Sequence, residues 1–240
     1  MNKKLLATSA LALLVSMGAN AQRFTDKLDR GLVAVKTTKG VYCSWRIQAD
    51  EYYDVKYNLY RDGTRVNAEP LDVSNFTDAS GSEGSQYTVK AVLNGVEQQA
   101  SKVATVLGNN YKEIIIKHDK SLKATYEPND ACCADVDGDG EVEILMKFTN
   151  KEESEQRYPT NGPTIDGVET KEYSMLACLK QDGTVLWWVN CGPNMGDFQN
   201  NEQNIVGYDW DMDGKAEVVM RLEEGSTVHM ADGTTYTIGA

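Results

Sequence analysis

Two short acidic runs constrain this chain more than any other feature of its sequence. Residues 135–143 read Asp-Val-Asp-Gly-Asp-Gly-Glu-Val-Glu, and residues 209–217 read Asp-Trp-Asp-Met-Asp-Gly-Lys-Ala-Glu. Carboxylates spaced this closely repel one another unless a hard cation lies among them, and Ca²⁺ takes roughly six to eight oxygen ligands at ~2.3–2.6 Å. One such run is also compatible with an ordinary solvated turn, but two copies with the same spacing favour two calcium-binding loops.

Both runs begin like an EF-hand and end differently. The twelfth position, where an EF-hand has a bidentate Glu, holds Met146 or Met220. Each run leads into an apolar segment, 144–148 or 218–222, which is typical of a strand. The Glu in ninth position is therefore expected to close each site, and a structural role for the metal is favoured over a catalytic one. The predicted ligands are the side chains of Asp135, Asp137, Asp139, Glu143, Asp209, Asp211, Asp213 and Glu217, and backbone carbonyls near Glu141 and Lys215.

The unit of acidic loop followed by strand occurs twice, and its copies start 74 residues apart, at 135 and 209. Repetition over tens of residues is typical of stacked or radial folds such as propellers. A hairpin around Asp182-Gly183, with arms at 173–180 and 185–191, and a strand at 113–118 supply further elements. These patterns predict that residues 108–240 form part of a calcium-binding β-propeller.

Short strands separated by turn signals characterise the region before residue 108. Asp62-Gly63 and Asn94-Gly95 are hairpin turn signals, and alternation in the run 41–45 puts Trp45 on an apolar face. We therefore expect an antiparallel β-sandwich over residues 22–107, with Trp45 in its core. The layout of its large aromatic residues resembles a fibronectin type III-like module. The strands predicted here are 31–36, 41–47, 55–61, 86–93 and 98–106.

The first 21 residues read as a secretory signal peptide. Lys3 and Lys4 precede an apolar centre, 5–17, and Ala19-Asn20-Ala21 is a small-residue cleavage site. We expect cleavage after Ala21 and a mature chain that is secreted or periplasmic. No other stretch approaches the ~20 apolar residues that a membrane span requires.

The formal charge of −12, from 36 acidic and 24 basic residues, restricts the partners of the chain. A surface this acidic argues against nucleic acid and anionic membranes. It also repels an acidic polysaccharide unless a metal or local basic groups reverse the field.

Five cysteines form an odd set without the close spacing of a zinc site or of a dense disulfide framework. Neighbouring Cys132 and Cys133 point to opposite faces of a strand, so a bond between them would be strained. We expect buried free thiols at all five positions, which are Cys43, Cys132, Cys133, Cys178 and Cys191.

Several runs, taken in order, carry a resemblance: residues 30–36, 41–46, 57–61, 128–131 and 182–187, together with the two acidic loops. In this order they resemble family 11 polysaccharide lyases, the rhamnogalacturonan lyases. The resemblance covers nearly all of the mature chain. It implies a β-sandwich followed by an eight-bladed propeller that carries several calcium ions and acts on rhamnogalacturonan I, an acidic pectic polysaccharide. It also implies that the enzyme cleaves the rhamnose–galacturonate backbone by β-elimination. We expect the full-length protein to be a monomer.

The resemblance also points to individual site residues. It implies that Asn129 binds sugar, although the same side chain could cap the turn before the first loop. Where the family has Lys-Trp-Asp, this chain has Lys-Phe-Thr at 147–149, and 192–207 lacks the family's Arg and His. The family's catalytic base lies in later blades, so no catalytic residue is assigned here and the 240-residue chain is expected to be inactive alone. Trp187 and Trp188 fit either sugar stacking or a core position.

A second class of function fits the same residues. A non-catalytic, calcium-dependent glycan-binding or adhesion propeller would need the same sandwich and loops, and a bare scaffold would need no sugar contact. Further loops of this type with interspersed His, Lys and Tyr would favour the enzyme.

Overall fold

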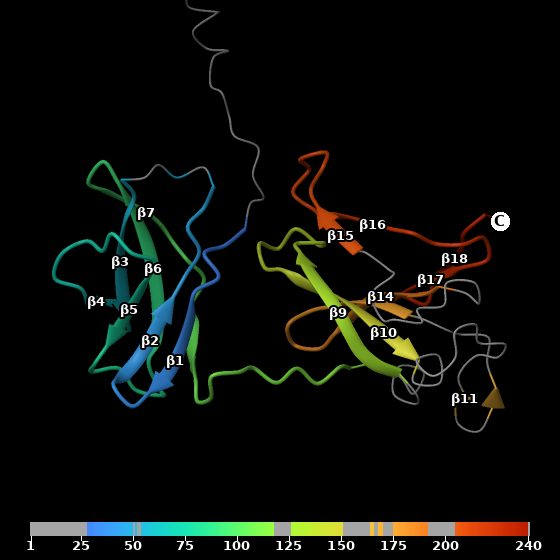
Figure 1. Ribbon diagram of the computed structural model, residues 1–240. Helices are drawn as coiled ribbons and strands as arrows, with labels where there is room; N and C mark the ends of the chain where they lie inside the picture. Colours follow the sequence, from blue (N-terminus) through green and yellow to red (C-terminus); the bar gives the residue numbers. More distant parts are fainter. Residues whose placement is uncertain are drawn as a thin grey trace, which may run out of the picture.

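All regular structure in the described chain is β-strand. The computed structural model describes residues 28–49, 51, 54–117, 126–150, 164–165, 168–169, 175–191 and 205–239 (Figure 1). Across these ranges the elements are strands alone, which confirms the predicted all-β class. Within the same ranges, no helix is long and apolar enough to cross a membrane. The predicted signal peptide and His118, the end of one predicted strand, lie outside the described residues.

The first half of the chain forms one eight-stranded sheet in the order β4-β3-β6-β8-β1-β2-β5, with β7 also on β6. β1 and β8 pair in parallel, and the other pairs in this sheet are antiparallel. Because β8 pairs with both β6 and β1, it joins the two halves of the sheet. The strands are β1 (Val33–Thr37), β2 (Gly40–Ser44), β3 (Lys56–Arg61), β4 (Thr64–Arg65), β5 (Asn75–Asp78), β6 (Gln86–Leu93), β7 (Val96–Ala100) and β8 (Ala104–Leu107).

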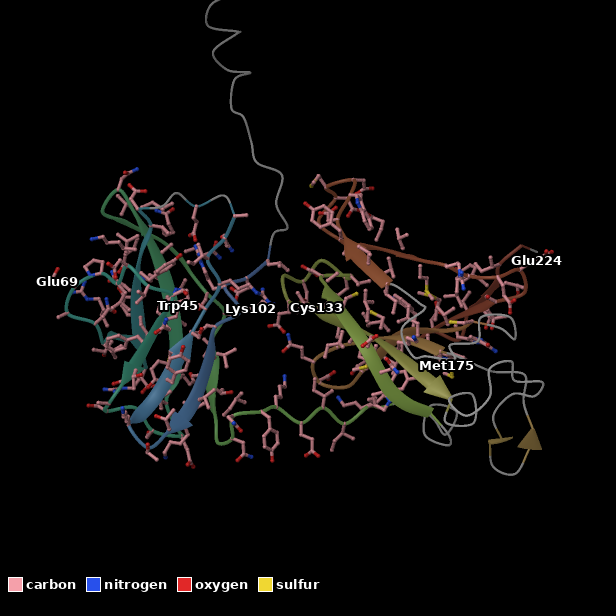
Figure 2. The ribbon with its side chains drawn as sticks, viewed as in Figure 1. Trp45, Glu69, Lys102, Cys133, Met175 and Glu224 are labelled. Atoms are coloured by element: carbon pink, nitrogen blue, oxygen red, sulfur yellow. The ribbon has the colours of Figure 1, made fainter. Side chains whose placement is uncertain are left out.

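The two halves of this sheet share one apolar core. Alternate residues of β2, β3 and β6 are fully buried, as the period of two requires for a strand with one covered face. Trp45 packs edge-on against Tyr57, with ring centroids 5.4 Å apart, and Figure 2 shows it inside this part of the molecule. The predicted core position of Trp45 is confirmed. The buried cluster comprises Leu32, Ala34, Val41, Cys43, Trp45, Val55, Tyr57, Leu59, Tyr87, Val89 and Ala91.

Both predicted hairpin turns in the first sheet are confirmed. Asp62 and Gly63 have φ of +51° and +79°, and Asn94 and Gly95 have +50° and +79°. Two successive positive φ values match the right-handed twist of the flanking strands, which explains the Asp-Gly and Asn-Gly pairs.

The predicted strand 98–106 is wrong as a single element, because the chain breaks between β7 and β8. At the break, the Ser101 hydroxyl accepts the backbone N–H of Val89 at 3.0 Å and donates to the Lys102 carbonyl at 2.8 Å. This side chain replaces a ladder hydrogen bond and lets the strand move from the edge of β6 towards β1. The sequence also missed β5, whose run Asn-Phe-Thr-Asp carries a single apolar residue.

The second half of the chain forms a six-stranded antiparallel sheet in the order β18-β17-β14-β13-β10-β9. Two further pairs stand apart, β11 with β12 and β15 with β16. The strands are β9 (Tyr126–Ala134), β10 (Glu143–Asn150), β11 (Thr164–Ile165), β12 (Val168–Glu169), β13 (Met175–Leu179), β14 (Val185–Asn190), β15 (Ile205–Tyr208), β16 (Glu217–Met220), β17 (Thr227–Met230) and β18 (Thr235–Thr237).

Both faces of the six-stranded sheet carry apolar clusters. One face holds Phe148, Met175, Ala177, Leu179 and Val185. The opposite face holds Leu145, Leu176, Cys178, Val189 and Cys191, and residues of β15 and β16 pack against it. This explains why β13 is buried at every position and reads as a continuous apolar run. The strands predicted after each acidic loop and around Asp182-Gly183 are confirmed.

One expectation for the second half is wrong. The segment predicted as a strand at 113–118 forms one isolated bridge, Lys117 with Thr184, because it crosses the turn at Gly183 instead of joining a sheet edge. Residues 126–130, which lead into the first loop, belong to β9. The polar sequence of this run lacks the apolar alternation that would predict a strand.

The two halves meet at the first acidic loop. Asp29 donates its backbone N–H to the Gly140 carbonyl at 2.8 Å, and Lys102 donates its Nζ–H to the Asp139 carbonyl at 2.8 Å. The backbone N–H of Lys102 donates to Asp29 Oδ1 at 2.9 Å, which holds the two contacts together. Figure 2 shows Lys102 on the side of the first sheet that faces the second.

All five cysteines are free, as expected, but their predicted burial is only partly confirmed. Cys43, Cys178 and Cys191 are buried, whereas Cys132 is half-buried and Cys133 is exposed. Cys132 and Cys133 do face opposite ways along β9, since Cys132 packs against an apolar cluster. Burial raises the pKa of the Cys43 and Cys178 thiols to about 12, so both stay protonated at neutral pH.

The crossing of segment 113–117 over the Gly183 turn can be tested with one substitution. A Cβ at Gly183, where φ is +87°, would lie 1.9 Å from the Ile115 carbonyl oxygen, whereas one at Gly233, with φ of +88°, would meet open space. We expect Gly233→Ala to cost about 1–2 kcal/mol for the left-handed backbone and Gly183→Ala roughly 1–3 kcal/mol more for overpacking. Denaturant unfolding measures both, and equal losses would contradict the contact.

Candidate metal centre

The first acidic loop connects β9 to β10 and gathers three carboxylates. Ligand oxygens of Asp135, Asp137 and Glu143 lie within 4.8 Å of one another. The Asp135 Oδ1 and Oδ2 atoms accept the backbone N–H groups of Gly138 and Gly140 at 2.7 and 2.8 Å. Positive φ at these glycines, +80° and +87°, lets the backbone curl around the carboxylate.

Glu143 is the most enclosed acid of this loop, with 2% of its surface exposed. Its Oε2 accepts the backbone N–H of Val136 at 2.8 Å. Burial raises the pKa of Glu143, and the nearby charges of Asp137 and Asp139 raise it further, against the lowering effect of the Val136 N–H. An ionised Glu143 is therefore costly unless positive charge lies close by.

The second acidic loop connects β15 to β16 with the same backbone pattern. Asp209 Oδ2 accepts the Gly214 N–H at 2.9 Å, and Glu217 Oε2 accepts the Trp210 N–H at 2.9 Å. Met212 takes the positive φ, +63°, that glycine takes in the first loop. Four carboxylates have ligand oxygens within 4.8 Å of one another, those of Asp209, Asp211, Asp213 and Glu217.

One oxygen in the second loop fits a cation site. Asp209 has 6% of its surface exposed, and its Oδ1 is buried without a hydrogen-bond partner. An unpartnered buried carboxylate oxygen is unfavourable by several kcal/mol. Because three more carboxylates surround it, a hard divalent cation is the group that fits this donor set.

The structure brings together seven of the eight predicted side-chain ligands and leaves one out. Asp139 is not part of the first cluster, whereas its counterpart Asp213 is part of the second. Glu141 and Lys215 donate their backbone N–H groups to Asp139 and Asp213, each at 2.8 Å. The role predicted for carbonyl oxygens near Glu141 and Lys215 stays a prediction, as does metal ligation itself.

Two lysines that the sequence pattern did not reveal account for the position of Asp139. Lys180 Nζ lies 2.5 Å from Asp137 Oδ2 and 3.0 Å from Asp139 Oδ2. Lys102, in the segment between β7 and β8, places its Nζ 3.3 Å from Glu141 Oε1. Hydrogen bonds to Asp137 and Asp139 raise the pKa of Lys180, which keeps it cationic. Neither lysine is near these acids in sequence, so no local motif could have identified them.

The two loops contact each other. Ala216 donates its backbone N–H to the Asp135 carbonyl at 2.6 Å. A Cβ at Gly138 would lie 3.0 Å from the Gly214 carbonyl oxygen, so the two loop backbones pack closely. The repeated motif therefore forms one paired centre.

Asn129, the predicted sugar contact, lies in a β-bulge. The register of β9 and β10 pairs Ala131 with Met146 and Pro128 with Phe148, so Asn129 and its neighbour both oppose one residue of β10. The half-buried Asn129 accepts the backbone N–H of the next residue on its own Oδ1 at 2.6 Å. Its predicted alternative role, capping a turn, is wrong because the residue is within a strand. Bulges redirect side chains and recur beside active sites.

The two tryptophans face opposite sides of the sheet, and both contact apolar clusters. Trp188 stacks on His229 of β17 with centroids 3.8 Å apart and planes 7° from parallel. Cross-strand stacking of this kind favours the core interpretation for Trp188. Sugar stacking by Trp187 stays a prediction.

Comparison with known proteins places this arrangement in a family. Residues 23–107 match the family model of the beta-sheet domain of rhamnogalacturonan I lyases, and residues 111–240 match that of the C-terminal domain of rhamnogalacturonan lyase family 11. The chain belongs to rhamnogalacturonan lyase family 11. The resemblance seen in the sequence is thus confirmed.

Two curated Bacillus subtilis (strain 168) proteins are similar to this family 11 chain. Rhamnogalacturonan endolyase YesW is 38% identical over 253 residues, which cover 99% of this chain and 38% of that protein. Rhamnogalacturonan exolyase YesX is 36% identical over 225 residues, which cover 91% and 34%. The chain therefore spans little more than a third of the length of these relatives.

Solved structures of family 11 lyases superpose on the chain. The crystal structure of YesW gives a TM-score of 0.70 at 36% identity, covering 92% of this chain and 37% of that one. The Bacillus licheniformis rhamnogalacturonan lyase PL11 gives 0.71 at 34% identity, covering 91% and 37%. The likeness extends over both halves of the chain.

Removing one carboxylate from either loop of this family 11 chain tests metal binding. Asp137→Ala or Asp211→Ala removes a ligand, so each should lower the melting temperature more in calcium than in chelator. A site saturated at 100 times its dissociation constant contributes about 2.7 kcal/mol. Asp232→Ala, in an exposed turn between β17 and β18, is the control and should respond equally in both buffers. Identical melting curves with and without chelator for the unsubstituted chain would contradict the site.

Proposed function

We propose that this chain is part of a secreted, calcium-binding rhamnogalacturonan lyase that cleaves the rhamnose–galacturonate backbone of pectin by β-elimination. The observation that carries the proposal is its 38% identity, over 99% of its length, to a protein named rhamnogalacturonan endolyase. Because the chain spans 38% of that relative, the activity is proposed for the whole lyase.

The chemistry requires the removal of a weakly acidic proton next to a uronate carboxylate. A lyase must neutralise that carboxylate, stabilise the negative charge that develops, and place a base within hydrogen-bond reach. We assign none of these tasks to a residue of this chain. The part proposed for it is to bind and orient the polysaccharide and to hold the fold that carries the base.

Asn129 is the proposed sugar contact. Its amide has donor and acceptor atoms that match sugar hydroxyls. The bulge in β9 supports this role, since it turns Asn129 out of the regular alternation of the strand. Opposite the bulge, Lys147 is fully buried, so this part of β10 is firmly packed and gives the contact a rigid base.

The proposed metal is calcium, held in the paired acidic loops. The ion would supply positive charge that neutralises the crowded carboxylates, and its role here is structural. Asp209 supports the assignment through its buried, unpartnered Oδ1. Neutralising the loops would also lessen the repulsion between a chain of charge −12 and an acidic polysaccharide.

The finer architecture and the location belong to the same proposal. We assign residues 22–107 to a fibronectin III-like β-sandwich and residues 108–240 to the first blades of a propeller. The shared core of the first sheet and the two apolar faces of the second support this division, because a blade is covered on both sides. Residues 1–21 would direct secretion or periplasmic export and be removed after Ala21.

A chimera tests the activity directly. Residues 22–240 would replace the matching segment of the YesW endolyase, and the product would be followed by ultraviolet absorbance of the unsaturated uronate. We expect product from rhamnogalacturonan and none from a neutral polysaccharide. A chimera that folds, as shown by its melting transition, but releases no unsaturated product from rhamnogalacturonan would overturn the proposal.

The sugar contact is tested in the same chimera. Asn129→Ala should lower kcat/KM roughly tenfold, the loss of about one hydrogen bond, with an unchanged melting temperature. Asn109→Ala, at an exposed position between the two sheets, is the matched control and should leave both values unchanged. An Asn129→Ala chimera as active as the unsubstituted one would exclude the contact.

A further inference from the structure

The first acidic loop already holds a cation of its own. Lys180 follows β13, and its ammonium lies 2.5 Å from Asp137 Oδ2 and 3.0 Å from Asp139 Oδ2. Asp137 is one of the three clustered carboxylates, whereas Asp139 has turned out of the cluster to meet Lys180. The ammonium therefore contacts two predicted metal ligands. Asp137 is in the cluster, and Asp139 is paired with Lys180 outside it.

The second loop shows the same motif without such a cation. Asp211 and Asp213 both remain in its cluster, and each accepts a backbone N–H. Among the described residues, no lysine or arginine forms an ion pair with the second loop. The two loops share one backbone pattern but differ in their lysine contacts, and Lys180 is the lysine that contacts a carboxylate of the first cluster.

We infer that Lys180 is an internal counter-cation that competes with the divalent ion for the first loop, so that the two loops fill in a fixed order, the second before the first. The inference rests on the proposed metal binding. The ammonium lies against Asp137 Oδ2. Because like charges repel, a divalent ion bound by Asp137 disfavours Lys180 at that position, so the two cations compete for the first loop. When the metal binds, Asp139 must join the cluster of the first loop, in the position that Asp213 has in the second loop.

The exchange of Lys180 for a metal ion affects the contacts that the first loop makes with the rest of the molecule. The loop contacts the first sheet through Asp29 and Lys102 and contacts the second loop through Ala216. If its carboxylates lost all positive charge, their repulsion would disturb both contacts. Lys180 keeps the loop in shape before metal arrives, and the metal takes over when it binds.

Calcium titration of the full chain by calorimetry tests the order. We expect a tight site that Asp211→Ala abolishes and a weaker site that Asp137→Ala abolishes. If Lys180 occupies the loop about nine-tenths of the time, Lys180→Met should tighten the weaker site about tenfold, because apparent affinity scales with the competent fraction. The tight site should not change. In chelator, Lys180→Met should lower the melting temperature, and Lys180→Gln is a second variant with the same expected results.

Lys102→Met is the matched control. It removes an equal charge from the same loop, but Lys102 meets the outer groups Asp139 and Glu141. We expect a change of less than about twofold at the weaker site, as for an exposed charge screened by salt. Equal tightening by Lys102→Met and Lys180→Met would overturn the inference, as would two sites of equal affinity that Lys180→Met leaves unchanged. Absence of any calcium binding would instead overturn the proposed metal function, so the two failures are distinct.

Discussion

Repulsion among carboxylates is the constraint on which the second half of this molecule depends. The chain gathers three acids in one loop and four in the next, and it packs the two loops against each other through the Ala216–Asp135 hydrogen bond. Each loop leads into a strand that packs on an apolar cluster, so the cost of the crowded charge is coupled to the gain from burying β10 and one face of β16. Backbone N–H groups and Lys180 offset part of that cost, and the buried Asp209 Oδ1 shows where an offset is still needed.

Local sequence signals predicted the local structure well. The Asp-Gly and Asn-Gly turns, the alternation around Trp45 and the strand after each acidic loop depend on neighbouring residues alone, and the structure confirms them. The spacing of acids at every second position likewise predicted which carboxylates share a cluster. The exception is Asp139, whose position depends on Lys180, a residue 41 positions away.

The errors have a common physical cause, which is that tertiary partners decided the outcome. The apolar run at 114–116 is typical of a strand, but the backbone of this segment hydrogen-bonds to the turn at Gly183 instead of to a sheet edge. The polar run in β9 carries no strand signal, yet pairing with β10 makes it a strand with a bulge at Asn129. The break at Ser101 follows from a side-chain hydrogen bond to Val89. No periodicity within these segments carries that information.

The contacts of the first acidic loop also bear on how the chain folds. Nine residues, 135–143, are completed by groups from Asp29, Lys102, Lys180 and Ala216, which span most of the described sequence. Contacts between residues so distant in sequence form late, because closing long loops is entropically costly. We therefore expect this loop to take its final form after both sheets have formed. The native contacts of this short segment require both halves of the chain, so we expect them to form at the end of folding. A probe of these contacts would therefore follow the formation of the complete native structure.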